Sequence, residues 1–195
     1  MFELPTSIEI NGAEYNIRNR GDYRVIIDCF VALDDMEMSK TERIYSALII
    51  FYEDLNDITD ILSLGDDLIP MIEKMFLFFN CNQPPMDTPI SKYKLVDWDK
   101  DSLLICSAVN DVAHTEIRSA EYIHWWTFMG YYMAVKECSL TTVVGIRYKI
   151  ASGKSLEKSE RKFRMDNPQY FTFDVRSQED READAYVKSI WNSTK

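Results

Sequence analysis

Residues 122–133 read YIHWWTFMGYYM, the longest aromatic-rich segment of the chain. It is apolar nearly all round, which is typical of a helix covered on more than one side. We therefore predict a central helix over 118–135 in a mainly α, multi-helix bundle. The side chains expected in the core are His124, Trp125, Trp126 and Phe128. An exposed aromatic groove for partner helices is the alternative that the pattern leaves open.

The composition supports long helices. Glycine and proline number only 6 each among 195 residues, so a turn-rich sandwich and a Gly-rich phosphate-binding fold are not expected. The length favours one domain, or one domain with an extension. We predict a helical domain over 1–170, with a loop at about 82–98 between two helical halves, and a C-terminal helical extension over 171–195.

Local signals place the elements on either side of the central helix. Asn11-Gly12 between alternating apolar residues predicts a small N-terminal β-hairpin. Asp22 can cap the helix that follows, and Ser39 with Glu42 forms a capping box for the next one. Helical periodicity predicts further helices over 57–64, 66–80, 99–113, 140–151, 155–165 and 177–192. Gly153 suits the end of the helix over 140–151, and Gly130 would let a neighbouring backbone approach closely.

Several fragments resemble catalytic motifs and lack a required part. Residues 148–155 approach a P-loop, but Tyr148 stands where the first glycine is needed to bring backbone N–H groups to a phosphate. Residues 121–124 form one Glu-x-x-His motif, whereas a di-iron helix bundle needs two. The four cysteines form no C-x-x-C pair, so we interpret them as reduced thiols. We expect no enzyme activity, no cofactor and no metal.

Charge is distributed unevenly along the chain. The net charge is −10, which disfavours nucleic acid on average. Residues 34–101 hold 15 acidic and 6 basic residues, whereas residues 147–164 hold 7 basic and 2 acidic ones. The basic residues are Arg147, Lys149, Lys154, Lys158, Arg161, Lys162 and Arg164. We predict that they form an interaction surface for self-association or a charged partner; a merely solvated helix face is the alternative.

The C-terminal extension provides a second predicted interaction element. Tyr186, Ile190 and Trp191 recur at helical spacing on one face of 177–192. A helix this short is marginal alone, so it must pack on the body of the protein or on another chain.

The order and spacing of several segments resemble the gene-product-fifteen family of tailed bacteriophages over roughly residues 8–165. The matching segments are Gly12-Ala13-Glu14-Tyr15-Asn16-Ile17, Asp22-Tyr23-Arg24, His124-Trp125-Trp126-Thr127-Phe128, Ile146-Arg147-Tyr148-Lys149 and Gly153-Lys154-Ser155-Leu156-Glu157-Lys158. The His-Trp-Trp helix is the most specific of them.

This resemblance implies a tail assembly chaperone, which coats the long tape-measure protein until tail tube subunits replace it. The partners expected from it are the tape-measure protein and the tail tube protein, in the cytoplasm of an infected or lysogenic host. The uneven charge adds further copies of the chain as an expected partner. Nucleic acid and membrane are not expected as partners. The alternative is a small nucleic-acid-binding or regulatory protein that uses the basic helices over 147–164.

Overall fold

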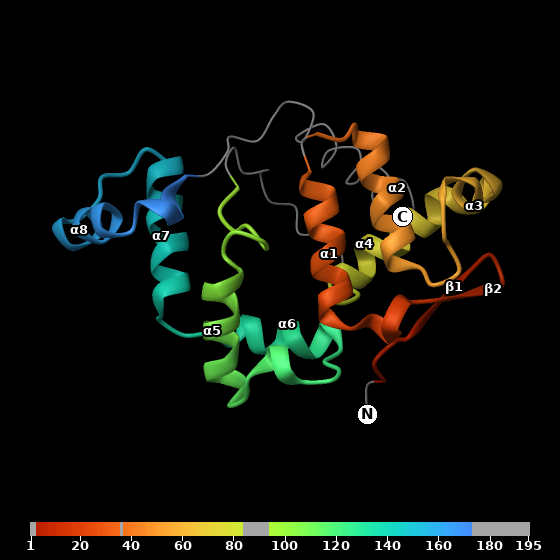
Figure 1. The fold of residues 1–195 in the computed structure, drawn as a ribbon, viewed down its shortest axis with the longest axis horizontal. Helices are drawn as coiled ribbons and strands as arrows, with labels where there is room; N and C mark the ends of the chain where they lie inside the picture. Colours follow the sequence, from red (N-terminus) through yellow and green to blue (C-terminus); the bar gives the residue numbers. More distant parts are fainter. Residues whose placement is uncertain (1–2, 36, 84–93, 173–195) are drawn as a thin grey trace. The chain divides into compact units, whose positions relative to one another are not determined.

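The computed structural model describes residues 3–35, 37–83 and 94–172 (Figure 1). The chain is mainly α, with a two-stranded antiparallel sheet near its N-terminus, and this confirms the predicted fold class. None of the described helices is long and apolar enough to cross a membrane.

The described chain forms two compact units. Unit 1 holds the described residues up to 83 together with 121–129, and unit 2 holds 94–120 and 130–172. The predicted division into 1–170 and 171–195 stays a prediction, because residues 173–195 and part of the 82–98 loop lie outside the described residues.

The hairpin of unit 1 forms where the Asn-Gly pair predicts it. Strands β1 (Ser7–Ile10) and β2 (Ala13–Asn16) pair with Ile8 opposite Tyr15. Asn11 and Gly12 both adopt positive φ angles, 51° and 84°. A tight two-residue turn requires that conformation at both positions, and these residue types tolerate it best.

Four α-helices follow the hairpin in unit 1. They are α1 (Tyr23–Asp34), α2 (Lys40–Phe51), α3 (Ile58–Ser63) and α4 (Leu68–Phe79), with 3-10 turns at Arg18–Gly21 and Gly65–Asp67. Asp22 caps α1 by accepting from the N–H of Arg24 at 3.0 Å. Ser39 and Glu42 form the capping box of α2. Both predicted caps are confirmed, because each depends on residues no more than three positions apart.

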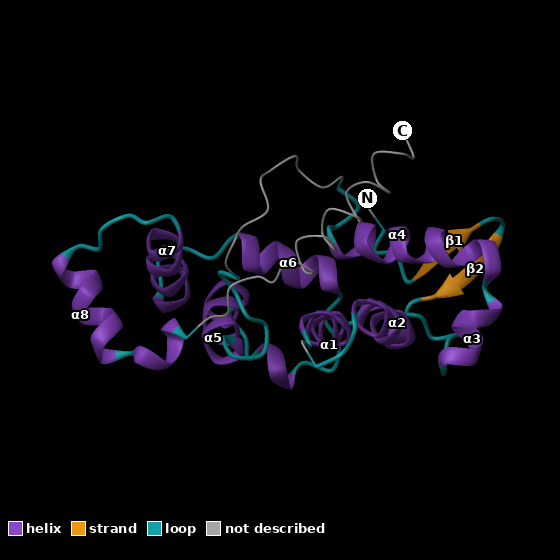
Figure 2. Cartoon of the chain, turned by 90° about the horizontal axis from the view of Figure 1, so that it is seen from above, coloured by secondary structure: helices purple, strands orange, loops and turns teal. Residues whose placement is uncertain are grey.

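The core of unit 1 lies between the hairpin and these helices. Helices α1 and α2 lie side by side (Figure 1 and Figure 2), and α4 packs on α2 and β1. The largest fully buried side chains here include Ile17, Ile26, Leu48, Phe51, Tyr52, Met71, Met75, Trp125 and Phe128. Most of them occupy the apolar stripes that the helical periodicity identifies.

The central helix is shorter than the predicted 118–135. Helix α6 spans Trp125–Met133, preceded by a 3-10 turn at Ile117–Ser119. His124 instead forms an antiparallel bridge with Asp22, and the carboxylate of Asp22 accepts from the N–H of Ile123 at 3.0 Å. These contacts satisfy the backbone in an extended conformation, so the helix begins only after His124.

Unit 2 is built on two packed helices, α5 (Ser102–Ala113) and α7 (Ser139–Ala151). The chain continues through α8 (Lys158–Asp166) to a 3-10 turn at Pro168–Phe171. Gly153 has φ 69° just after α7, and Lys154 N–H donates to the Lys149 carbonyl at 2.8 Å. The predicted helix end is therefore confirmed.

The C-terminal helix and the surroundings of Gly130 were also predicted from the sequence. The helix over 177–192 lies outside the described residues. The expected close approach at Gly130 is wrong, because a Cβ built there has no described atom within 4 Å.

Candidate binding groove

An open, mostly apolar groove of about 440 Å³ lies along α7 in unit 2. Its lining residues are Leu95, Tyr132, Val135, Leu140, Thr141, Val144, Gly145 and Tyr148. Leu140, Val144 and Tyr148 are four residues apart, and this spacing places them in one row along the helix. Tyr148 leaves half of its surface exposed, at 50%. The groove can therefore hold an apolar side chain from another polypeptide.

Gly145 forms part of the groove at a position where no packing contact requires a glycine. A Cβ built on it meets no described atom within 4 Å, so the space above it is open. A glycine inside a helix costs about 0.8–1.0 kcal/mol relative to alanine. A larger residue here would occupy the open space, so Gly145 keeps this part of the groove empty.

Aromatic rings and one lysine border the groove. The ring of Tyr132 packs against Trp98, with centroids 5.5 Å apart. Burial raises the pKa of the Tyr132 hydroxyl, and the nearby Asp101 charge raises it further. On α7, the Lys154 ammonium lies 4.9 Å from the centre of the Tyr148 ring. The groove thus has an apolar interior and a cation beside an exposed ring.

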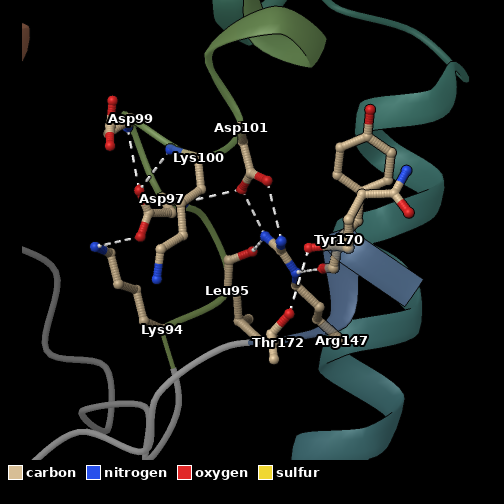
Figure 3. A network of polar contacts seen from close by, with 10 residues as sticks. Lys94, Leu95, Asp97, Asp99, Lys100, Asp101, Arg147, Tyr170 and Thr172 are labelled. Atoms are coloured by element: carbon tan, nitrogen blue, oxygen red, sulfur yellow. Dashed lines mark hydrogen bonds and ion pairs between the residues drawn. The ribbon is translucent and has the colours of Figure 1, made fainter. Parts of the chain in front are cut away.

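A buried ion pair holds one wall of the groove (Figure 3). The Arg147 guanidinium contacts both carboxylate oxygens of Asp101, at 2.5 and 3.0 Å, and these side chains are only 3% and 0% exposed. Arg147 also donates to the carbonyl of Leu95 at 2.9 Å and to that of Tyr170 at 2.7 Å. Because Leu95 lines the groove, the ion pair positions that wall against α7.

The turn that leads into α5 is tied to the same ion pair. The carboxylate of Asp101 accepts from the N–H of Asp97 at 3.0 Å. Asp97 in turn accepts from the N–H of Lys100 at 2.9 Å and from the ammonium of Lys94 at 3.0 Å. Burial alone would raise the pKa of Asp97, but these hydrogen bonds and the two lysine charges outweigh it, and the pKa is lowered. Asp97 thus stays charged and holds the turn closed.

The predicted basic residues separate into different environments. Arg147 is buried in the ion pair, so it does not belong to an exposed surface. Lys149 donates to Glu160 at 2.6 Å; this hydrogen bond raises the pKa of Lys149 and lowers that of Glu160. The other five are exposed: Lys154, Lys158, Arg161, Lys162 and Arg164. The predicted interaction residues Tyr186, Ile190 and Trp191 lie outside the described residues.

The residues predicted for the core lie in unit 1. Trp125 and Phe128 are buried, while Trp126 is half-buried. The indole N–H groups of Trp125 and Trp126 donate to the carbonyls of Phe79 and Phe78, at 2.9 and 3.0 Å. These carbonyls belong to the last turn of α4, whose C=O groups lack partners within the helix. The tryptophan pair therefore closes the end of α4.

His124 is buried and both of its ring nitrogens are engaged. Nδ1 accepts from the N–H of Trp126 at 3.0 Å, so the proton is assigned to Nε2, which donates to the Pro5 carbonyl at 3.0 Å. Burial lowers the pKa of His124. Glu121, the other member of the Glu-x-x-His motif, is exposed. No group of three or more potential metal ligands occurs within the described ranges.

Two structural roles were not found from the sequence. Arg18 donates to four carbonyls around the end of α2, those of Ile49, Ile50, Tyr52 and Leu55, at 2.9 to 3.1 Å. A basic residue is favourable at a helix C-terminus, but Arg18 lies more than 30 positions before these partners. Gly145 carried a usable signal, since a glycine in the middle of a helical pattern calls for a reason.

Comparison with known proteins identifies a family. The family model described as Bacteriophage Gp15 protein matches residues 1–170. No curated protein and no solved structure matches the chain.

Proposed function

The chain belongs to the bacteriophage Gp15 family and is a phage protein, and we propose that it is a non-catalytic tail assembly chaperone. In this proposal it binds the tape-measure protein in the cytoplasm of the host and releases it to the tail tube. The family resemblance supplies the role, and the groove on α7 supplies a place for the client.

The single observation that carries the proposal is the open groove with Gly145 in its lining. An amphipathic helix binds in an apolar groove through side chains at i, i+3, i+4 and i+7. Leu140, Val144 and Tyr148 offer a matching row along α7. An open apolar groove of this kind can take up apolar side chains of a partner.

The positive charge beside the groove indicates which kind of client segment fits there. Lys154 contacts the Tyr148 ring at the edge of the groove and is exposed. The best-matched segment of a tape-measure protein is therefore an apolar helical stretch flanked by acidic residues.

The nucleic-acid-binding alternative has less support. Arg147, which opens the basic segment, is occupied by the buried ion pair. Phe163 is half-buried and its ring packs edge-on against Phe171 with centroids 6.4 Å apart, so it is not free to stack on a base.

Co-expression with the tape-measure protein of the same phage tests the proposal. We expect soluble co-purification with the parent and a loss with Gly145→Leu, because the added side chain fills the groove. Losing burial of one client side chain, about 1.5–3 kcal/mol, weakens binding about ten- to hundredfold.

The matched control is Gly130→Leu. Gly130 is also helical, exposed and open above its Cα, but it does not line the groove. Leucine has a higher helix propensity than glycine, so neither substitution should destabilise the helix that carries it. Co-purification that survives Gly145→Leu, or fails equally with both variants, would contradict a role for the groove.

A further inference from the structure

Helix α8 presents a positive face. This basic face consists of Lys158, Arg161, Lys162 and Arg164, all of them exposed. Glu160, which lies between them in sequence, is paired with Lys149. Within the described residues, none of the four cations takes part in an ion pair. The exposed acids Glu157 and Asp166 lie at the two ends of the helix, so the excess of positive charge is in its middle.

The same chain presents an uncompensated negative region in unit 1. Residues 45–73 hold seven acidic residues and no lysine or arginine. The exposed or half-buried acids around α3 are Glu53, Asp54, Asp57, Asp60, Asp66 and Asp67. Glu9 and Glu14 add to this acidic region from the hairpin, where they are exposed and directly opposite each other. Like charges at such a cross-strand pair are destabilising.

Hydrogen bonds hold the segment after α2 against the hairpin. Asp67 accepts from Asn11 at 2.7 Å and from the Tyr15 hydroxyl at 3.1 Å. Asp54 accepts from the N–H of Asn16 at 2.9 Å. The segment after α2 is thus fastened to the hairpin, and α3 and the hairpin lie together in both views (Figure 1 and Figure 2).

We propose that the basic face of α8 docks on the acidic region of a second copy of this chain. Each surface carries the charge that the other lacks, and complementary charge steers association and fixes its register. Each also exposes a large apolar side chain, Met165 at 80% and Leu62 at 70%. Because the two surfaces differ, the contact is heterologous and repeats from copy to copy.

This self-association goes beyond client binding and does not depend on it. None of the residues of the basic face or the acidic region lines the groove on α7. Each copy in an assembly therefore keeps its own groove, and an array of copies offers a row of grooves to an elongated client.

Reciprocal charge reversal tests the contact. One variant carries Arg161→Glu and Lys162→Glu, and the other carries Glu9→Lys and Asp66→Lys; these are exposed positions outside the caps of α1, α2 and α3. We expect the parent to associate at 0.1 M salt and to dissociate at 1 M, where the Debye length falls from about 10 Å to about 3 Å. Each variant alone should be monomeric by light scattering, and a mixture of the two should associate again.

The control replaces Lys74 and Lys136 by glutamate, two exposed lysines outside both surfaces, which changes the net charge by the same amount. It should associate as the parent does, with unchanged helical content. A monomeric parent, variants that associate alone, a mixture that stays monomeric, or association that nuclease abolishes would each overturn the proposal.

Discussion

Removing Arg147 should destabilise unit 2 far more than removing a surface cation. Arg147→Met leaves the Asp101 carboxylate buried without its counter-charge, because neither side chain is more than 3% exposed. Breaking a buried pair in this way typically costs about 3–5 kcal/mol. The carbonyls of Leu95 and Tyr170 lose their donor as well, so the upper part of this range is expected.

Urea denaturation followed by circular dichroism measures this cost. The midpoint should fall for Arg147→Met, and Arg147→Lys should fall less, because an ammonium keeps the charge but not the two-pronged geometry. The double variant Arg147→Met with Asp101→Leu should recover part of the loss, since both charges are then gone. A surface control, Arg161→Met, should change the free energy of unfolding by about 0.5 kcal/mol or less.

If Arg147→Met costs under about 1 kcal/mol, the pair behaves as an exposed one and does not hold the Leu95 wall of the groove. If the double variant costs as much as the sum of the single changes, Arg147 and Asp101 are not coupled.

Three further predictions concern unit 1. Trp125 is buried, so Trp125→Ala should lower the free energy of unfolding by about 3–5 kcal/mol. Trp126 is half-buried, so Trp126→Ala should lower it by about 1–3 kcal/mol. Equal losses for the two variants in thermal melting would contradict the difference in burial. Because the pKa of His124 is lowered by burial, the unfolded chain binds a proton more readily, so stability should fall as the pH drops below about 6.5. His124→Gln should reduce the pH dependence of the free energy of unfolding, measured by denaturation from pH 7 to 5. An unchanged pH dependence would mean that another group causes it. Gly21→Ala should cost about 1–3 kcal/mol in the same assay, because φ is 77° and a Cβ would come within 2.9 Å of a phenylalanine ring; a neutral change would contradict the strain expected for a side chain in this turn.

Local chemistry explains which parts of the fold could be predicted. The Asn11-Gly12 turn, the Asp22 cap and the Gly153 helix end each depend on a few neighbouring residues, and all three occur. The start of α6 depends instead on a bridge between Asp22 and His124, about 100 residues apart in sequence. Helical periodicity contains no information about that contact.

The site was harder to predict for the same reason. The sequence placed Arg147 in a basic run, where it looks like its neighbours, but its partner Asp101 lies 46 positions away. The groove needs Leu95 and Tyr132 beside one face of α7, and only the tertiary packing brings them there. The exposed cations of α8 could be predicted, because a helix without an apolar stripe leaves its charges in solvent.

Site-specific photo-crosslinking of the co-purified complex tests whether the groove on α7 holds the client. Benzoylphenylalanine at Tyr148 lies in the groove, whereas the same residue at Leu103, which is 63% exposed on α5, lies outside it. We predict that mass spectrometry finds crosslinks to an apolar helical segment of the tape-measure protein from position 148 and not from position 103. Crosslinks of equal yield from both positions, or none from position 148 in an intact complex, would contradict the proposed groove.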